Sequence, residues 1–160
     1  MRTAAVITVS DSSFHKLRDD LSGPAVANAL RQAGFEVVAT EIVPDHQISI
    51  ENAIIRMCDV ARLVVTTGGT GVAETDLTPE ATGSVCDRIV PGLAERMRAE
   101  GMKRTLFASL SRGICGIRGA VLIVNLPGSP SAASESLASI VEVLPHALDL
   151  LAGKTQHAQP

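Results

Sequence analysis

Aromatic side chains are nearly missing from this 160-residue chain, which has no Trp, no Tyr and three Phe. Basic residues are not in excess either, because the formal net charge at pH 7 is −3. Proteins that bind nucleic acids usually present basic patches and aromatic rings that stack on bases. The composition therefore argues against a nucleic-acid partner.

Long apolar runs are also absent. The stretch 120–124 is among the longest, and it is far shorter than the roughly 20 residues that a helix needs to cross a bilayer. The apolar residues after Arg2 pass directly into polar ones without a cleavage region, so residues 3–9 are interpreted as a first strand and not as a signal peptide. We expect no membrane span and no membrane partner.

Cysteine is scarce and lacks any C-x-x-C pair, with single residues at Cys58, Cys86 and Cys115. An odd number of widely spaced cysteines is typical of a reducing compartment, which predicts a cytoplasmic protein whose thiols are small buried hydrophobes. The four histidines show no i, i+4 pairing and no cysteine partner at metal spacing. A zinc site is therefore disfavoured.

Hydrophobic residues make up 46% of the chain, and Ala, Val, Ile and Leu dominate them. Segments with β-branched residues alternate with segments that have helical spacing. Strands are expected at 3–9, 35–43, 63–66 and 119–125, and helices at 22–33, 50–58, 78–87, 91–100 and 129–151. This alternation predicts one α/β domain over 1–153, a three-layer sandwich with a mainly parallel central sheet, followed by a frayed tail at 154–160.

Capping residues and prolines set the expected helix ends. Ser22 and Thr78 are expected to cap the helices that begin there, with Pro79 at the first helical position of the second. Gly34 should end the first helix, and Pro145 should bend or break the last one.

Ligands of such folds bind beyond the carboxyl ends of the strands, so the loops that follow the strands are the candidate site. These loops are Ser10-Asp11-Ser12, Pro44-Asp45-His46, Thr67-Gly68-Gly69-Thr70-Gly71 and Leu126-Pro127-Gly128-Ser129.

The loop Thr67–Gly71 is the strongest single feature. Three glycines in four positions allow positive φ angles and let backbone N–H groups approach an anion, while the two threonines add hydroxyl donors. The loop is neither a P-loop, since it has no lysine, nor a G-x-G-x-x-G fingerprint. It is interpreted as a phosphate- or pterin-binding loop, with a plain tight turn as the alternative.

Two carboxylates follow strands at the same expected edge of the sheet, Asp45 and Asp76. Paired carboxylates next to phosphate-binding loops are what a hard cation such as Mg²⁺ needs, and Thr78 then opens a helix whose N-terminus favours anions. Asp76 could instead hydrogen-bond its own loop, and Asp45 could cap the following helix.

Two further segments complete the candidate site. Pro127-Gly128-Ser129 leads from a buried strand into a helix, and Ser111-Arg112 adds a hydroxyl and a guanidinium that could clamp a phosphate. The alternatives are a simple turn for the first segment and an ordinary surface arginine for the second.

At these loops the chain resembles the Mog/MoaB family of molybdenum-cofactor biosynthesis proteins. The resemblance spans about residues 3–150, in family order. Its motifs are Val9-Ser10-Asp11, Asp20-Leu21-Ser22-Gly23-Pro24, Val43-Pro44-Asp45, Thr66-Thr67-Gly68-Gly69-Thr70-Gly71, Asp76-Leu77-Thr78-Pro79-Glu80-Ala81-Thr82, Pro91-Gly92-Leu93, Leu110-Ser111-Arg112-Gly113 and Asn125-Leu126-Pro127-Gly128-Ser129-Pro130.

The resemblance implies a molybdopterin-binding fold, a homotrimer, and an adenylyltransferase that uses ATP and Mg²⁺ to make adenylyl-molybdopterin and pyrophosphate. It implies that Asp45 and Asp76 are the functional carboxylates. It also implies that the Ser10 loop and the glycine-rich loop hold nucleotide and pterin, and that the Pro127 loop meets the pterin or its phosphate. The molybdate-insertion protein of the pathway would be a partner.

One position departs from the family pattern. Many members carry an arginine immediately before the second carboxylate, where this chain has Thr75 preceded by Glu74. The lost positive charge leaves open a second hypothesis, a molybdopterin-binding or scaffold protein without turnover. An unrelated nucleotide-binding enzyme with a flavodoxin-like sheet is a third, and it would require the ordered motifs to be a coincidence.

Overall fold

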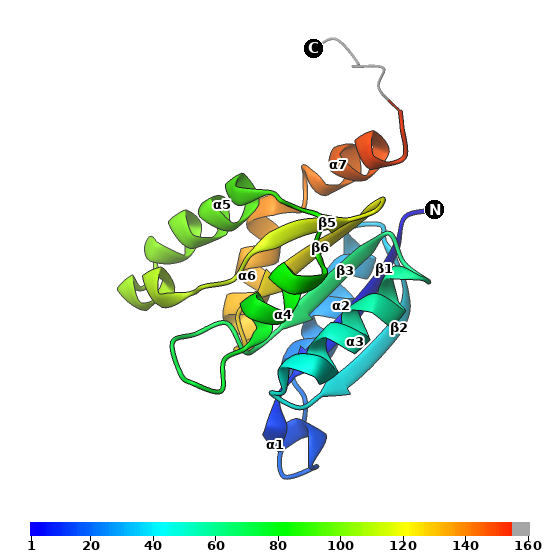
Figure 1. Ribbon diagram of the computed structural model, residues 1–160. Helices are drawn as coiled ribbons and strands as arrows, with labels where there is room; N and C mark the ends of the chain where they lie inside the picture. Colours follow the sequence, from blue (N-terminus) through cyan, green and yellow to red (C-terminus); the bar gives the residue numbers. More distant parts are fainter. Residues whose placement is uncertain (155–160) are drawn as a thin grey trace.

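A six-stranded sheet forms the centre of the computed structural model, which describes residues 1–154 (Figure 1). The strands follow the order β2 (Glu36–Val43), β1 (Thr3–Val9), β3 (Leu63–Thr67), β6 (Val121–Leu126), β5 (Cys115–Arg118) and β4 (Arg88–Ile89). The first four strands are mutually parallel, whereas β5 and β4 are antiparallel to their neighbours. The mainly parallel sheet is confirmed.

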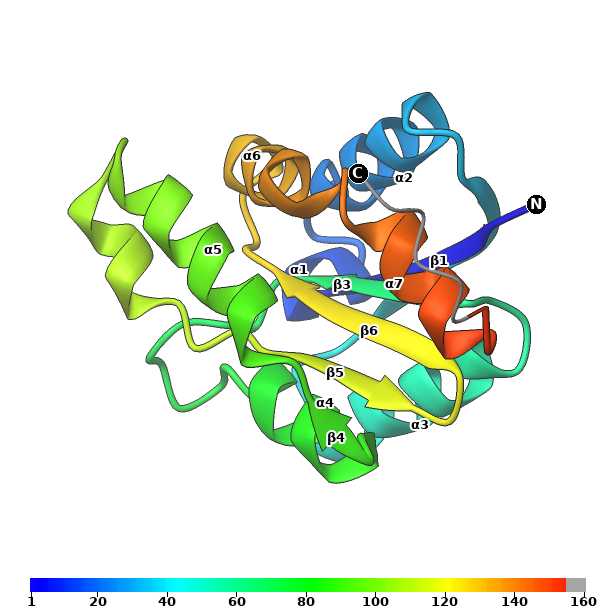
Figure 2. The ribbon, with the colours of Figure 1, turned by 90° about the horizontal axis from the view of Figure 1, so that it is seen from above.

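Helices cover both faces of this sheet (Figure 2). One face carries α2 (Ser22–Gln32), α5 (Pro91–Met102), α6 (Pro130–Ile140) and α7 (Leu144–Leu151), and the other carries α3 (Gln47–Cys58) and α4 (Thr78–Val85). Two short helices, α1 (Asp11–Phe14) and the 3₁₀ helix η1 (Leu106–Leu110), belong to connecting segments. The three-layer sandwich is confirmed.

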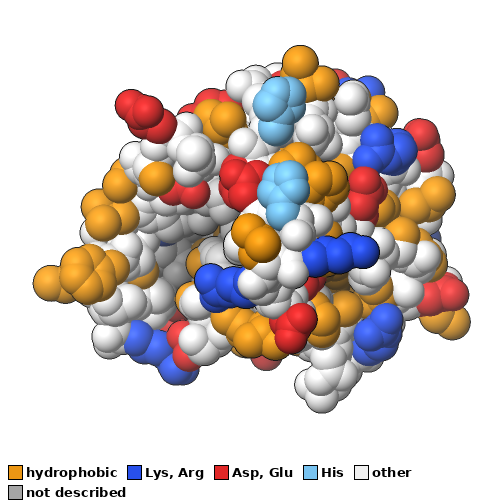
Figure 3. All heavy atoms as spheres, turned by 90° about the horizontal axis from the view of Figure 1, so that it is seen from below, with side chains coloured by type: hydrophobic (Ala, Val, Ile, Leu, Met, Phe, Trp, Pro, Cys, Tyr) orange, Lys and Arg blue, Asp and Glu red, His pale blue; other side chains and the backbone are white. Residues whose placement is uncertain are grey.

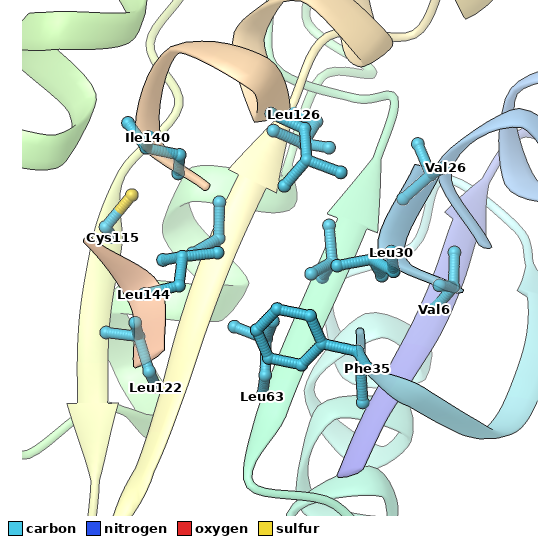
Figure 4. Packing of buried hydrophobic residues seen from close by; sticks show 14 of the residues in the cluster. Val6, Val26, Leu30, Phe35, Leu63, Cys115, Leu122, Leu126, Ile140 and Leu144 are labelled. Atoms are coloured by element: carbon cyan, nitrogen blue, oxygen red, sulfur yellow. The ribbon is translucent and has the colours of Figure 1, made fainter. Parts of the chain in front are cut away.

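Two aliphatic clusters hold the layers together, one on each side of the sheet. In the first, Val6, Leu63 and Leu122 of the strands meet Leu30 of α2 and Leu144 of α7 (Figure 4). All five side chains are 0–1% exposed. Burying such a side chain contributes roughly 1.5–3 kcal/mol, so this core stabilises the fold without disulfides.

The starts of two helices differ from the prediction. Ser22 does not cap α2; instead the Asp20 carboxylate accepts from the Gly23 amide at 3.0 Å and from the Thr8 hydroxyl at 2.7 Å. Thr78 does not cap α4, because its hydroxyl donates to the Gly68 carbonyl at 2.9 Å. For Thr78, a contact with another loop takes the side chain that the local pattern had assigned to the helix, whereas for Ser22 the nearby Asp20 carboxylate takes the capping role.

Helix α1 was not predicted, α3 begins at Gln47 and not at residue 50, and other differences lie after residue 80. The helix predicted at 78–87 ends at Val85. The break predicted near Pro145 is confirmed, because the last helix is interrupted at 141–143 and Pro145 lies in the first turn of α7. Strands β4 and β5 were not predicted, and Gly119, with φ +57°, makes the turn of an unexpected β5–β6 hairpin.

Within the described residues, no helix is long and apolar enough to cross a membrane. The tail predicted to fray at 154–160 lies outside the described residues, apart from Lys154.

Candidate active site at the carboxyl edge of the sheet

The loops that follow β3 and β6 lie against each other, because these strands are parallel neighbours. The Thr67 hydroxyl donates to the Pro127 carbonyl at 2.7 Å, and the Gly68 amide donates to the Leu126 carbonyl at 3.1 Å. A Cβ on Gly128 would lie 3.4 Å from the Gly68 Cα. The structure thus brings two of the predicted loops together into one backbone surface.

The glycine-rich loop requires its glycines. Gly68 and Gly69 have φ angles of +99° and +67°, a region that other residues adopt only with strain. Within residues 1–154 the amide groups of Gly69, Thr70 and Gly71 donate no hydrogen bond. Consecutive unpaired N–H groups form a concavity that binds anions, so the backbone of this loop is suited to a phosphate.

Several predicted hydroxyl donors are already engaged within the protein. Thr67 and Thr78 are 0% exposed, and both donate to backbone carbonyls. Ser10 caps α1 by accepting from the Ser13 amide, and Ser129 caps α6 by accepting from the Ala132 amide. Thr67 and Thr78 therefore shape the loops, whereas the Ser129 hydroxyl, which only accepts within residues 1–154, can still donate to a ligand alongside the backbone N–H groups.

Asp45 and Asp11 hold the first two loops together by a reciprocal pair of hydrogen bonds. The Asp11 amide donates to Asp45 Oδ2 at 2.9 Å, and the Asp45 amide donates to Asp11 Oδ1 at 2.8 Å. The N-cap residue of α3 is His46, so Asp45 does not cap this helix. The other Asp45 oxygen, Oδ1, faces the glycine-rich loop, 3.4 Å from where a Gly69 Cβ would lie.

Asp76 also lies beside this loop, next to Gly71. Its Oδ2 accepts from the Ala73 amide at 3.0 Å and lies 2.8 Å from where a Gly71 Cβ would be. Neither Asp45 Oδ1 nor Asp76 Oδ1 accepts a hydrogen bond within residues 1–154. Each carboxylate is thus held by one oxygen and free at the other, as the ligands of a hard cation need to be.

The pKa of the Asp45 carboxyl is raised above its usual value. Burial is the largest cause, the negative charges of Asp11 and Asp76 act in the same direction, and the hydrogen bond from the Asp11 amide opposes them. A cation bound between the carboxylates would relieve this repulsion. The donor chemistry therefore fits Mg²⁺, with phosphates and water supplying its other ligands, since the described residues contain no cluster of three or more protein ligands.

Asp45→Asn is expected to raise the midpoint of thermal unfolding at pH 7, without divalent cations, by about 1–3 °C. The pKa is higher in the folded protein than its ordinary 3.8, so ionising Asp45 costs stability once the pH exceeds that value. The gain should therefore shrink as the pH falls from 7 to 4. Thermal unfolding at both pH values with a chelator measures it.

The exposed carboxylate Asp19 provides the control for this stability test, because Asp19→Asn removes the same charge outside the site. A gain of equal size at pH 4 and pH 7 for Asp45→Asn would contradict the assignment of repulsion to this cluster.

Arg112 is committed to the backbone of the glycine-rich loop. Its Nε donates to the Gly71 carbonyl and its Nη2 to the Asp76 carbonyl, both at 2.7 Å, and its guanidinium forms an ion pair with Glu80. Its own amide donates to the Thr70 carbonyl at 2.7 Å. The phosphate clamp remains a prediction, but these bonds leave few guanidinium donors for it, and they indicate that Arg112 holds the loop that carries Asp76.

Arg112→Lys is therefore expected to lower turnover by about tenfold and to increase amide hydrogen exchange in residues 71–76, because one ammonium cannot serve three separated acceptors. Glu80→Gln, which leaves the two carbonyl contacts of Arg112 intact, should have a smaller effect on both measurements. Equal turnover and exchange in the wild type and Arg112→Lys would show that the loop keeps its shape without the guanidinium.

A cavity of about 720 Å³ extends from the glycine-rich loop between α5, η1 and α6. Figure 3 shows the carboxyl edge of the sheet from below, with a hollow on this face. Glycine-rich loop residues, Asp76 and Pro127-Gly128 lie at one end of the cavity. Its charged walls, which sequence reasoning missed, include Arg98, Arg104 and Glu135. Nothing in their local pattern distinguishes them from ordinary polar positions of surface helices.

The cysteines offer no nucleophile to this site. Burial raises the pKa of the thiols of Cys58 and Cys86 to about 11 and that of Cys115 to about 12. Cys115 is fully buried, as predicted, whereas Cys58 and Cys86 are only partly buried. Protonated thiols react slowly, so chemistry at the site would depend on positioning and charge.

Comparison with known proteins identifies the family. The model of the family described as "Probable molybdopterin binding domain" matches residues 5–146. Molybdopterin adenylyltransferase of Helicobacter pylori is 41% identical over 152 residues, 92% of this chain and 86% of the relative. The Escherichia coli K12 molybdopterin adenylyltransferase is 38% identical over 140 residues, 84% of this chain and 71% of the relative.

Among solved structures, that of the molybdopterin biosynthesis enzyme MoaB from Thermus thermophilus has a TM-score of 0.90 and 47% identity. The match covers 96% of this chain and 98% of that one. This chain therefore agrees with that structure over nearly the whole fold. It also has the loop order, the glycine-rich turn and the paired carboxylates described above. The chain belongs to the Mog/MoaB family of molybdopterin-binding domains.

Proposed function

We propose that this protein is a molybdopterin adenylyltransferase of molybdenum-cofactor biosynthesis, which transfers AMP from ATP to the terminal phosphate of molybdopterin and releases pyrophosphate. The observation that carries the proposal is the pair of carboxylates, Asp45 and Asp76, each with one oxygen that accepts no hydrogen bond within residues 1–154, beside a loop with unpaired amides. Relatives that bear this name match the chain over most of its length.

The transfer needs no protein nucleophile. An oxygen of the molybdopterin phosphate attacks the α-phosphorus of ATP, the new P–O bond forms, and the bond between the α-phosphorus and the bridging oxygen breaks to release pyrophosphate. The amides of Gly69, Thr70 and Gly71 would stabilise the charge on the transferred phosphate. The N-terminus of α6, next to Gly128, would offer further N–H donors to the molybdopterin phosphate.

Asp45 and Asp76 would hold Mg²⁺ through their free oxygens. When bound there, the cation supplies charge neutralisation for two phosphate groups that repel each other. Asp11 keeps Asp45 in place through the reciprocal hydrogen bonds, and Arg112 keeps the Asp76 segment in place through its carbonyl contacts.

The proposal is tested by measuring pyrophosphate release from Mg-ATP with and without molybdopterin. We expect release only when both substrates are present, and none when a chelator replaces Mg²⁺. Absence of release by a protein that demonstrably binds molybdopterin would favour the second candidate below.

That second candidate is a molybdopterin-binding protein without turnover, and Thr75 is the observation that favours it. Thr75 and Glu74 are both exposed beside Asp76, where many family members have a positive charge. The Arg112 guanidinium, which contacts the Asp76 carbonyl, supplies a positive charge to the same loop. Its presence favours the enzyme.

A homotrimer and a cytoplasmic location are also part of the proposal, as is a later encounter with a molybdate-insertion protein. Within residues 1–154 the outer strand β2 pairs only with β1, and its Val38 and Ile42 side chains are exposed, so this strand is a surface that proteins commonly cover by association. The free thiols suit a reducing compartment. Light scattering should give a mass three times that of the chain.

A further inference from the structure

The distal part of the cavity contains a carboxylate that the proposed chemistry does not use. Glu135 lies in α6 and lines the cavity together with Arg104, which follows α5. Arg104 Nη1 donates to Glu135 Oε1 at 2.5 Å, so the ion pair joins α6 to the segment that follows α5. Glu135 Oε2 accepts no hydrogen bond within residues 1–154.

The position of Glu135 separates it from the phosphate end. With a rise of about 1.5 Å per residue, Glu135 lies about 8 Å along α6 from Pro130, which adjoins the Gly128 loop. Apolar residues also line the cavity, among them Met97, Ala108 and the largely exposed Phe107. This arrangement suits a flat heterocycle whose phosphate reaches back to the glycine-rich loop.

The chemistry of a carboxylate selects among heterocycles. A pterin presents two adjacent donors on its pyrimidine edge, the N3–H and the 2-amino group, and an ionised carboxylate accepts from both. Adenine presents an acceptor, N1, next to a donor, the 6-amino group, on the corresponding edge. A carboxylate can accept from the amino group, but its other oxygen is repelled by N1. The hydrogen bond from Arg104 would keep Glu135 oriented.

We infer that Glu135 recognises the aminopyrimidinone edge of the pterin, with Arg104 as its positioning residue, and that the pair directs pterin and not adenine into the distal cavity. This inference rests on the proposed function, because it takes molybdopterin to be the substrate. It adds Glu135 as the residue that distinguishes molybdopterin from ATP.

The test compares two probes that differ at one position, pterin and lumazine, which has a carbonyl oxygen in place of the 2-amino group. The wild type should bind pterin about 10- to 100-fold more tightly than lumazine, the affinity that one charge-assisted hydrogen bond contributes. Glu135→Gln should abolish or reverse this preference, because an amide offers one acceptor and one donor and so matches lumazine. Fluorescence titration measures both affinities.

Glu95→Gln serves as the matched control, since Glu95 is an exposed α5 carboxylate outside the cavity. Arg104→Gln should weaken the pterin preference without removing it. Mg-ATP affinity should stay the same in Glu135→Gln, and thermal unfolding checks that each variant is folded.

The outcomes separate this inference from the proposed function. Retention of the pterin preference by Glu135→Gln, together with molybdopterin-dependent pyrophosphate release, would overturn the role of Glu135 and leave the enzyme in place. If Glu135→Gln loses the pterin preference but the wild type releases no pyrophosphate, the pterin contact is supported and the proposed enzyme activity is overturned.

Discussion

Asp76→Asn is expected to lower the rate of pyrophosphate release by about 100-fold or more while leaving the fold unchanged. The amide oxygen can still accept from the Ala73 amide, so the loop keeps its hydrogen bond. The substitution removes the negative charge at the free oxygen, where a cation would bind between two phosphates. Steady-state kinetics over a range of Mg²⁺ concentrations, with thermal unfolding as the folding check, measures both effects.

The control for this experiment removes a carboxylate outside the site, where the loss of charge should not change the kinetics. Asp59→Asn, at the exposed carboxyl end of α3, should show wild-type kinetics. In Asp76→Asn the apparent affinity for Mg²⁺ should fall along with turnover. Wild-type turnover at low Mg²⁺ concentration in this variant would remove Asp76 from the proposed metal site.

The fold was predictable because its strands and helices have different periodicities. Residues 3–9 and 63–66 are short β-branched runs, and both form buried parallel strands. Strand β4 has two residues, both exposed, and β5 has only two buried positions, so neither has a pattern that distinguishes it from a loop. The hairpin that joins β5 to β6 is defined by tertiary pairing.

The candidate site was predictable only where it follows the topology. Loops after adjacent parallel strands must meet at one edge, and the contact of Thr67 with Pro127 follows from that rule. The use of each side chain was not predictable, because Arg112 and Thr78 find partners 41 and 10 residues away in the chain. The roles of Arg104 and Glu135 depend on helix packing, which single-sequence periodicity does not specify.

Gly69→Val is the second substitution with a large expected effect, and we expect catalytic efficiency to fall by about 100-fold or more. The φ angle of +67° strains any β-branched residue, and a Cβ would lie 2.4 Å from the Thr78 hydroxyl oxygen and 3.3 Å from Val9 Cγ1. The loop must therefore move, and its free amides would no longer point at the phosphate. The affinity for molybdopterin should fall together with turnover.

Gly119→Val separates strain from steric damage at the site. Gly119 has a similar φ angle of +57°, but a Cβ there meets no atom within 4 Å. Both variants should unfold at lower temperature, because each places a β-branched residue at positive φ, at a cost of about 1–3 kcal/mol. Only Gly69→Val should lose molybdopterin binding. Equal losses of binding in the two variants would mean that general destabilisation, and not the shape of the glycine-rich loop, accounts for the effect; unchanged binding in Gly69→Val would show that the loop is only a turn.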